Sequence, residues 1–330
     1  MSVLLPVRNA AEFLGQCLSS LAAQTLADHE VIAVDDGSTD GSRADLDAAA
    51  RSDPRLHVVA AEGRGLVAAL NTGLREARGP LVARMDADDV AHPDRLALQR
   101  ARLEADGATD ILGCRVRLVG SAPGNAGMRA YVDWQNALLD HAAIVRDLFV
   151  ESPLVHPSVM ARATILRALG GYRDVDWPED YDLWLRAHAA GRRFAKTRET
   201  LLDWRDRPGR LTRTDPRYSP DRFLALKLEA LLAGPLSRPR PVVVWGAGPV
   251  GKAWSRALAA RGLPVTAFVE VDPRKIGQQI HGAPVVGVSD APRPGAFHLA
   301  DVGIGEARER IRIEAARLGL VEGRDLVAVA

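Results

Sequence analysis

The chain has 330 residues, of which 47% are hydrophobic and 26% charged, and this length and composition indicate a globular protein of two domains. Its net charge of +1 gives no basic footprint for a nucleic acid, and its two cysteines are too few for a disulfide framework. The N-terminus lacks a signal-peptide pattern and no apolar run is long enough to span a bilayer, so we expect a cytoplasmic protein, with peripheral contact to the inner face of a membrane left open.

The first 86 residues alternate between short apolar stretches and stretches with helical spacing. A strand is expected over 2–6 and a helix over 10–26, with Asn9 as its N-cap and Glu12 completing a capping box. The next expected elements are strands over 30–36, 55–61 and 80–86 and helices over 43–52 and 65–79. This β-α order predicts a mostly parallel sheet with helices on both faces.

Polar residues follow three of these strands. Pro6 to Asn9 come after the first strand, Asp35 and Asp36 after the second, and Asp86 to Asp89 after the fourth. Ligands of such sheets bind at the carboxyl ends of the strands. We therefore expect these residues to converge on one binding site.

Three aspartates crowd the end of the fourth strand. Residues two apart in a strand point to the same side, so Asp86 and Asp88 are expected to face one way, and Mg²⁺ or Mn²⁺ would relieve their repulsion. Alternatively, Asp88 and Asp89 only cap the helix that follows. Asp36 has a similar ambiguity: its carboxylate accepts a hydrogen bond from a base or a ribose, or only shapes a turn.

The middle of the chain is less regular. Residues 133–150 and 179–191 are expected to be helical, 153–162 extended, 204–222 a surface loop and 223–234 a closing helix. The Pro- and Arg-rich stretch 236–241 is the most linker-like. We therefore predict one domain over 1–235, a linker over 236–241 and a second domain over 242–330.

A glycine fingerprint opens the second predicted domain. A strand leads into Gly246, Gly248 and Gly251, then a helix, then a second strand that ends near Glu270. This context is typical of dinucleotide binding, with a phosphate at the helix N-terminus and Lys252 assisting. The same glycines also serve simply for close packing of helix and strand, so a nucleotide, NAD(P) or no ligand all stay open.

Five separated motifs closely resemble the family 2 glycosyltransferases of the GT-A fold. They are LLPVRNAAEF, EVIAVDDGSTDGS, the stretch from GRGLVAALNTG to ARMDADD, HPSVMARATILRALGGYRD and WPEDYDLWLRAHAAG. The resemblance covers roughly residues 1–215. It implies an α/β fold with a Rossmann-like nucleotide-diphospho-sugar transferase domain. The remainder resembles small Rossmann-like units, some of which precede sugar acyltransferase domains.

The resemblance implies an inverting transfer of a sugar from a nucleotide-diphosphate donor, typically UDP-linked, to a hydroxyl of a glycan or lipid-linked acceptor, as in surface polysaccharide biosynthesis. It also implies roles for individual residues. Pro6, Arg8, Asp36 and Arg64 would contact the donor nucleotide, Asp86 and Asp88 would form the metal-binding DxD motif, and Asp180, beside Glu179, would be the catalytic base.

Further candidates lie near the diphosphate or the acceptor: His156, Trp177, Arg205 and Arg207. The family often carries Tyr-Arg-x-His after the base helix, and here Arg205 matches the arginine while Arg207 replaces the histidine. Each candidate has an ordinary structural alternative. Acidic residues in a first helical turn favour the helix dipole, and Trp177, like Trp134, is as typical of a core.

Two other functions stay open at this point. An NAD(P)-linked sugar-modifying enzyme would act through the second domain, although that domain contains no Tyr-x-x-x-Lys pair. A non-catalytic sensor would bind a nucleotide sugar without turning it over. The sequence predicts neither the sugar nor the oligomeric state.

Overall fold

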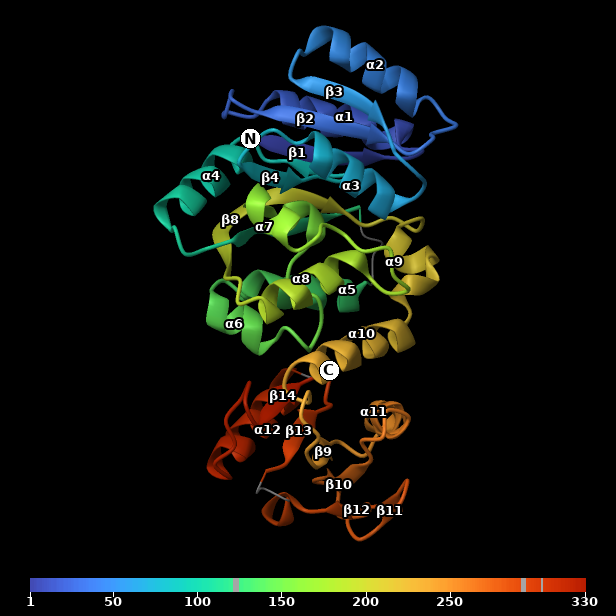
Figure 1. Cartoon of the computed structure of the whole chain (residues 1–330), viewed down its shortest axis with the longest axis vertical. Coiled ribbons are helices and arrows are strands. Elements are labelled where there is room, and N and C mark those ends of the chain that lie inside the picture. The colour runs from blue at the N-terminus through green and yellow to red at the C-terminus, as the bar shows by residue number, and fades with distance from the viewer. Residues whose placement is uncertain (121–124, 292–294, 304) are drawn as a thin grey trace. The chain divides into compact units, whose positions relative to one another are not determined.

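The computed structural model describes residues 1–120, 125–291, 295–303 and 305–330. These residues form two compact units, shown in Figure 1. The N-terminal unit comprises Met1–Ile144 and Pro153–Asp215, and the C-terminal unit comprises Val145–Ser152 and Pro216–Ala330. The linker expected over 236–241 lies within the C-terminal unit, and the domain boundaries stay a prediction.

An eight-stranded sheet organises the N-terminal unit, in the order β3-β2-β1-β4-β7-β6-β8-β5. Pairing is parallel from β3 through β4, antiparallel around the short β7, and parallel again between β6 and β8. The strands are β1 Ser2–Val7, β2 Glu30–Asp35, β3 Leu56–Ala60, β4 Leu81–Arg84, β5 Val90–Ala91, β6 Ile111–Val119, β7 Met160–Arg162 and β8 Phe194–Arg205. The predicted parallel sheet is confirmed.

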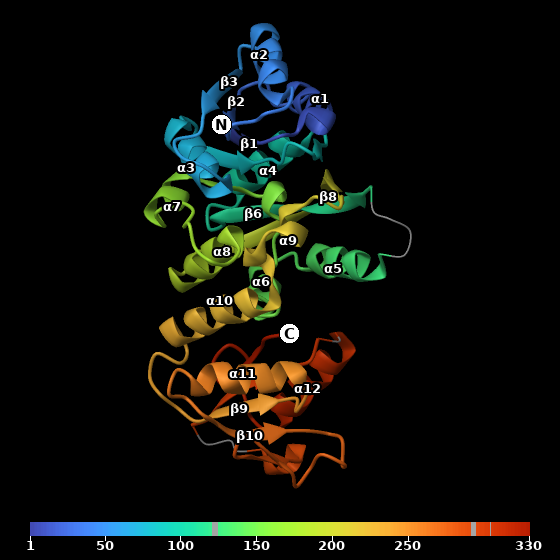
Figure 2. The ribbon, with the colours of Figure 1, turned by 90° about the vertical axis from the view of Figure 1, so that its right-hand side faces the viewer.

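Helices cover both faces of this sheet, as Figure 2 shows for α1 and α3. The helices of the unit are α1 Ala11–Ala22, α2 Ser42–Ser52, α3 Leu66–Glu76, α4 Arg95–Ala105, α5 Ala126–Ala137, α7 Ala163–Ala168, α8 Glu179–Ala189 and α9 Leu211–Thr214. A further helix, α6 His141–Arg146, begins in this unit and ends in the other.

Successive side chains of β1 point to opposite faces of the sheet, as the pleat of a strand requires. Leu5 belongs to the apolar cluster that also contains Leu14 of α1. Its neighbour Leu4 lies under α3, where a Cβ added to Gly73 would come within 3.2 Å of the Leu4 side chain. Glycine at this position therefore lets α3 lie close to the sheet.

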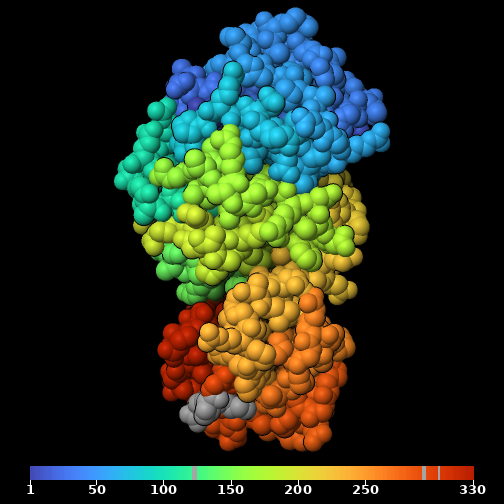
Figure 3. Space-filling model, viewed as in Figure 1, coloured from blue at the N-terminus to red at the C-terminus, as the bar shows by residue number. Residues whose placement is uncertain are grey.

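Hydrogen bonds join α3 and α7, and the atoms of these two segments, light blue and yellow-green, lie against each other on the face in Figure 3. The Arg167 guanidinium donates to the backbone oxygen of Ala77 at 2.5 Å, and the Asn71 side chain accepts from the backbone N–H of Tyr172 at 3.0 Å. These bonds fix the segment that leads into α8.

The predicted N-cap of α1 is wrong. Asn9 adopts a left-handed conformation with φ 50°, and its side chain accepts from the backbone N–H of Thr39 at 2.8 Å instead. The N–H of Ala10 donates to the Ser42 hydroxyl at 2.8 Å and that of Ala11 to the Asp40 carboxylate at 3.1 Å. The turn after β2 thus caps α1 across the sheet edge.

The middle of the chain also differs from the sequence predictions. The helix expected over 133–150 is two helices, α5 and α6, and the loop expected over 204–222 begins as the end of β8 and contains α9. The long strands β6 and β8 were not predicted. The first four residues of each strand are buried, whereas several later residues are partly exposed, so neither strand forms a single apolar run.

A six-stranded sheet in the order β11-β12-β10-β9-β13-β14 forms the core of the C-terminal unit. All its pairs are parallel except β11 with β12. Its elements are α10 Pro220–Ala233, β9 Val242–Trp245, α11 Pro249–Ala259, β10 Val265–Val269, β11 Gln279–Ile280, β12 Ala283–Val286, β13 Phe297–Ala300, α12 Gly305–Arg317 and β14 Leu326–Ala328. The predicted strand–glycine–helix–strand order and the second α/β domain are confirmed.

Within the described part of the chain, no helix combines the length and the apolar character needed to cross a bilayer.

Candidate active site

The loops after β1 and β2 meet at one edge of the N-terminal sheet. Arg8 and Asp36 form an ion pair at 3.1 Å, and the backbone N–H of Gly65 donates to both oxygens of the Asp36 carboxylate at 2.9 and 3.0 Å. Asp36 is buried, whereas Arg64 is exposed at the start of α3. Because Asp36 accepts from Gly65, just before α3, the neighbouring Arg64 is held near the acid, and Pro6 lies half-buried in β1 in register with Val34 of β2.

The three aspartates after β4 do gather in space. Carboxylate oxygens of Asp86, Asp88 and Asp89 lie within 4.8 Å of one another. Each has a positive or donor group beside it: Asp86 pairs with the buried Arg84 of β4, and Asp88 pairs with Arg207 at 2.6 Å. Asp89 is 1% exposed and accepts from the backbone N–H of residue 205 at 2.8 Å.

The electrostatics of this cluster favour a cation. Burial raises the pKa of Asp89 well above its usual value, and the charges of Asp86 and Asp88 raise it further. Burial is the largest single influence on the pKa of Asp86 and acts to raise it, but the charges of Arg84, His156 and Arg210 and the Arg84 hydrogen bond together lower the net pKa. Among the described residues, no group bonds to the second oxygen of Asp89. An acid-rich set with an orphaned buried oxygen fits a hard divalent ion.

The alternative that Asp88 and Asp89 cap the following helix is wrong. Helix α4 begins at Arg95, its N-cap is Asp94, and no side chain caps it. The carboxylates of Asp88 and Asp89 instead accept from the end of β8 and the residues after it.

Two arginines at the end of β8, Arg205 and Arg207, lie against the aspartate cluster and form one wall of it. Arg205 donates to the backbone oxygen of Asp88 and to the Gln16 side chain, both at 2.8 Å. The guanidinium carbons of Arg205 and Arg207 lie 4.8 and 5.6 Å from the centre of the Phe13 ring. The structure therefore brings both predicted arginines to the aspartate cluster.

Arg210 joins this wall and was not predicted. Its guanidinium carbon lies 4.0 Å from the centre of the Trp204 ring, and its charge acts to lower the pKa of Asp86 and of Asp89. The only signal in the sequence was its place in an Arg-rich stretch, WRDRPGR.

The second acidic pair opens α8. Glu179 is 2% exposed, and its carboxylate lies 3.6 Å from His156 Nδ1. The other ring nitrogen of His156 is 3.1 Å from the Tyr172 hydroxyl. Burial lowers the pKa of His156, and the Arg84 charge lowers it further, which favours a neutral imidazole between Tyr172 and Glu179. Asp180 is half-buried, and its carboxylate accepts from the backbone N–H of Tyr181 at 2.7 Å.

One buried arginine connects the two acidic sets. Arg84 is 4% exposed and ion-paired to Asp86, and its pKa is also influenced by the charges of Tyr172 and Glu179. The acids after β4 and those of α8 therefore belong to one electrostatic network. Sequence reasoning missed Arg84 and Tyr172, since each reads as part of an ordinary strand or loop.

Trp177 lies just before α8 and is held by a polar contact. Its indole N–H donates to the Asp182 carboxylate at 3.3 Å, and Asp182 in turn pairs with Arg186 at 2.6 Å. The indole is half-buried. It is thus fixed in place with part of its surface accessible beside the acids of α8.

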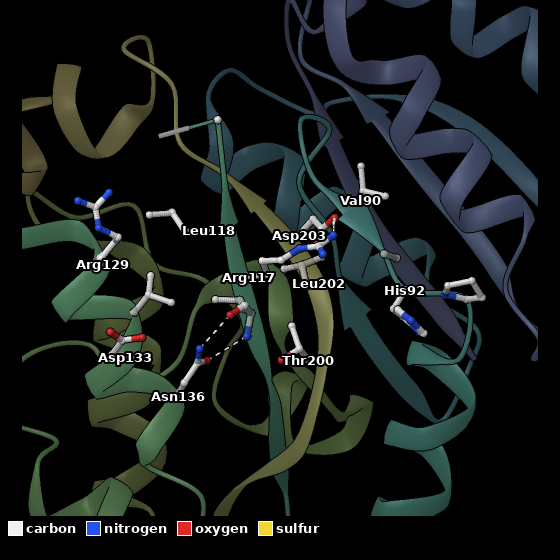
Figure 4. Close-up of a pocket in the computed structure, with 15 residues that line it drawn as sticks. Val90, His92, Arg117, Leu118, Arg129, Asp133, Asn136, Thr200, Leu202 and Asp203 are labelled. Atoms are coloured by element: carbon white, nitrogen blue, oxygen red, sulfur yellow. Dashed lines mark hydrogen bonds and ion pairs between the residues drawn. The ribbon is translucent and has the colours of Figure 1, made fainter. Parts of the chain in front are cut away.

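A cavity of about 940 Å³ opens between α5 and strands β5, β6 and β8 (Figure 4). It begins at Val90, the residue after Asp89, and its wall includes the ion pair of Arg117 with Asp203 at 2.6 Å. The Asn136 side chain on α5 bonds both the N–H and the C=O of Val116. None of the described residues that line this cavity was predicted as a site residue.

The glycine loop of the C-terminal unit is tightly packed. Gly246 has φ 118°, and a Cβ on Gly251 would lie 2.2 Å from the Gly246 oxygen and 2.8 Å from the Asp301 carboxylate. Around Gly248, by contrast, nothing lies within 4 Å of an added Cβ. The Glu270 carboxylate accepts from the backbone N–H of residue 247 at 3.3 Å and pairs with a lysine at 2.9 Å.

Comparison with known proteins identifies the family. The model of "Glycosyl transferase family 2" matches residues 2–169. The putative glycosyltransferase EpsE of Bacillus subtilis is 31% identical over 67% of this chain and 78% of its own length. The UDP-Gal:alpha-D-GlcNAc-diphosphoundecaprenol beta-1,3-galactosyltransferase of Escherichia coli is 30% identical over 60% of this chain and 70% of its own length.

Solved structures show the same fold. Residues 1–349 of S. aureus TarS, in complex with UDP-GlcNAc, align with a TM-score of 0.57 and 21% identity over 70% of this chain and 66% of that one. The mannosyltransferase PcManGT of Pyrobaculum calidifontis, in complex with GDP-Man and Mn²⁺, aligns with a TM-score of 0.55 and 22% identity over 78% of this chain and 74% of its own. The chain has the GT-A fold and belongs to glycosyl transferase family 2.

Proposed function

We propose that the chain is a metal-dependent, inverting glycosyltransferase that moves a sugar from a nucleotide-diphosphate donor to an acceptor hydroxyl in surface polysaccharide biosynthesis. The observation that carries the proposal is the meeting of two acidic sets in one unit. The aspartates after β4 and the acids that open α8 share the charge of Arg84. An inverting transfer needs two such sets, one for the leaving group and one for the attacking hydroxyl.

The donor nucleotide is expected at the edge formed by β1 and β2. Asp36 would accept from the base, with Pro6, Arg8 and Arg64 beside it. Its carboxylate is held by Gly65 and Arg8, which fixes its position before a ligand arrives. Relatives suggest a uridine nucleotide, since the Escherichia coli relative is named for UDP-Gal and TarS was solved with UDP-GlcNAc. PcManGT was solved with GDP-Man, so the experiment must include both bases.

Mg²⁺ or Mn²⁺ would be held by Asp86 and Asp88, with the unpartnered oxygen of Asp89 next to them. When bound, such an ion stabilises the negative charge that builds up on a departing diphosphate. The mannosyltransferase neighbour was solved with Mn²⁺. The protein itself supplies arginine side chains at the same edge, which suit diphosphate oxygens.

Asp180 would take the proton of the attacking hydroxyl. It is the less buried member of the pair, and Glu179 is held inward beside His156. Glu179 would therefore position the first turn of α8, while Asp180 faces the acceptor. A direct displacement forms no covalent sugar–enzyme bond, so no nucleophile is required. The acceptor, a glycan or a lipid-linked sugar, is expected beside Trp177.

We infer that the C-terminal unit is accessory to this reaction. Its glycine loop fits the pyrophosphate of NAD(P) poorly, since the buried Asp301 carboxylate lies against the first turn of α11. The N–H of Ala247 is already donated to Glu270, and Pro249 has no N–H to offer. Gly246 and Gly251 account for close packing of helix and strand without a ligand.

Thermal unfolding with nucleotide sugars tests the proposed function. UDP- and GDP-sugars should raise the melting temperature in Mn²⁺ and have little effect after chelation. Asp88→Asn should remove the Mn²⁺-dependent shift, and Asp94→Asn, which changes a nearby carboxylate outside the cluster, should keep it. A nucleotide-sugar shift that survives both chelation and Asp88→Asn would overturn the metal assignment. No shift with any donor would overturn the proposed donor class.

A further inference from the structure

Two arginines lie at the aspartate cluster, and the structure holds them very differently. Arg205 is anchored three times: its backbone N–H donates to Asp89, and its guanidinium donates to the Asp88 backbone and to Gln16, all at 2.8 Å. Breaking that set would disturb the end of β8. Arg205 is therefore a fixed part of the wall.

Arg207 has a single side-chain hydrogen bond among the described residues, to the Asp88 carboxylate at 2.6 Å. Its side chain is 36% exposed, while that of Asp88 is 15% exposed. The residue between the two arginines is firmly held, since Asp206 pairs with Arg213 and accepts from Asn125. Asp206, the residue before Arg207, is thus held in place, whereas the Arg207 side chain is partly exposed and can change partner.

A divalent cation and the Arg207 guanidinium compete for the carboxylate of Asp88. The Arg207 Nε donates to the carboxylate of Asp88, which is one of the three carboxylates whose oxygens lie within 4.8 Å of one another. A cation placed there would repel the guanidinium, since both are positive. The same cation would bring a donor diphosphate, whose oxygens form strong, bidentate bonds with arginine.

We propose that Arg207 exchanges partners: it neutralises Asp88 when the site holds no cation, and it binds the donor diphosphate once a cation takes Asp88. This rests on the proposed function, and it assigns the diphosphate contact to Arg207 rather than Arg205. Arg207 is then a specificity-determining residue for diphosphate donors and also a competitor of the metal. The proposal predicts that removal of the Arg207 charge raises the affinity for the cation and lowers the affinity for the nucleotide diphosphate.

Arg207→Gln separates the two effects. Mn²⁺ binding without nucleotide, measured by calorimetry, should become tighter by up to about fivefold, because a partly exposed ion partner is removed. Binding of UDP or GDP in saturating Mn²⁺, whichever binds the wild type, should weaken about tenfold or more, because a charge-assisted bond is lost. Arg207→Lys keeps the charge and should leave Mn²⁺ affinity close to that of the wild type.

Arg117→Gln is the matched control. It also breaks an Arg–Asp pair of 2.6 Å on the β6–β8 ribbon, with Asp203, and should change neither affinity. If Arg207→Gln weakens both ligands, or neither changes, the exchange is overturned while the proposed function stands. If the wild type binds neither UDP nor GDP with Mn²⁺, the proposed function and the exchange fail together.

Discussion

The two units use the carboxyl edge of a parallel sheet in opposite ways. In the N-terminal unit the acids at this edge are matched by positive groups, with Asp86 against Arg84 and Asp88 against Arg207. In the C-terminal unit, Asp301 follows β13 at the corresponding edge, and its buried Oδ1 has no hydrogen-bond partner among the described residues. The positive charge of Lys227 acts to lower the pKa of Asp301.

Under the proposed function, the N-terminal edge is the one that binds ligands, and the C-terminal edge is taken up by packing. An acid with a partly exposed counter-charge, as Asp88 has in Arg207, can exchange partners at modest cost, because a partly solvated ion pair contributes little stability. A buried carboxylate without a partner costs stability when it is ionised, because its charge is not compensated. In its ionised form it would also repel a pyrophosphate. A shared topology therefore does not imply a shared ligand, and three changes sharpen or break this comparison.

The largest effect is expected at the functional edge, from Asp180→Asn. If Asp180 takes the acceptor proton, the rate of sugar transfer should fall by about 10²- to 10⁴-fold, the usual contribution of a general base. Binding of the donor nucleotide in Mn²⁺ should stay unchanged, because the residue lies in α8 and not among the β4 aspartates. Transfer rate and nucleotide affinity, measured on the same protein, give the test.

Glu179→Gln is the comparison for that change. It keeps the shape of the buried side chain beside His156 and removes only the charge, so it should lower the rate less. A variant with asparagine at 180 that transfers sugar at the wild-type rate would assign the base to another group.

The next effect concerns packing at the other edge. Gly251→Ala places a Cβ 2.2 Å from the backbone oxygen of Gly246, and backbone cannot move aside cheaply. We expect a loss of about 3 kcal/mol in the free energy of unfolding. Gly248→Ala, in open space with φ −87°, should cost less than about 1 kcal/mol. If both variants lose the same free energy of unfolding in chemical denaturation, the contact between Gly251 and the backbone oxygen of Gly246 is not tight.

The sequence predicted the strands β1, β2 and β4 and the polar residues at their ends, because these strands are almost entirely buried. Each strand appears as a short apolar run that ends at polar residues: Arg8 and Asp36 form an ion pair after β1 and β2, and the three aspartates after β4 gather in space. The family motifs then point to the same residues, such as Asp86 and Asp88. Local pattern and tertiary position agree here, so little information is missing.

The sequence failed where distant segments decide the outcome. Asn9 has the local pattern of a cap, but Ser42 and Asp40 reach the first N–H groups of α1 across the sheet edge and replace it. Arg84 gave no signal, because its importance comes from its burial beside Asp86 and near Glu179. The strands β6 and β8 pair with each other over a long separation in sequence, which periodicity does not report.

The smallest expected effect tests whether Asp301 truly lacks a partner. Burial raises its pKa to about 7, against about 4 in an unfolded chain. The folded protein therefore keeps a proton that the unfolded chain releases, and the free energy of unfolding falls as the pH rises from about 4 to 7. Asp301→Asn stays neutral at every pH, so its stability relative to the wild type should grow by about 2 kcal/mol between pH 5 and pH 8.

Chemical denaturation of both full-length proteins at the two pH values measures this difference, and the titrations of groups that Asp301 does not influence are common to both proteins and cancel. A difference that is the same at pH 5 and pH 8 would mean that Asp301 is ionised and compensated in the folded chain. The glycine loop would then have a balanced charge beneath it, as the aspartate cluster of the N-terminal unit does. The contrast between the two edges would disappear, and a phosphate at the start of α11 would become compatible with its surroundings.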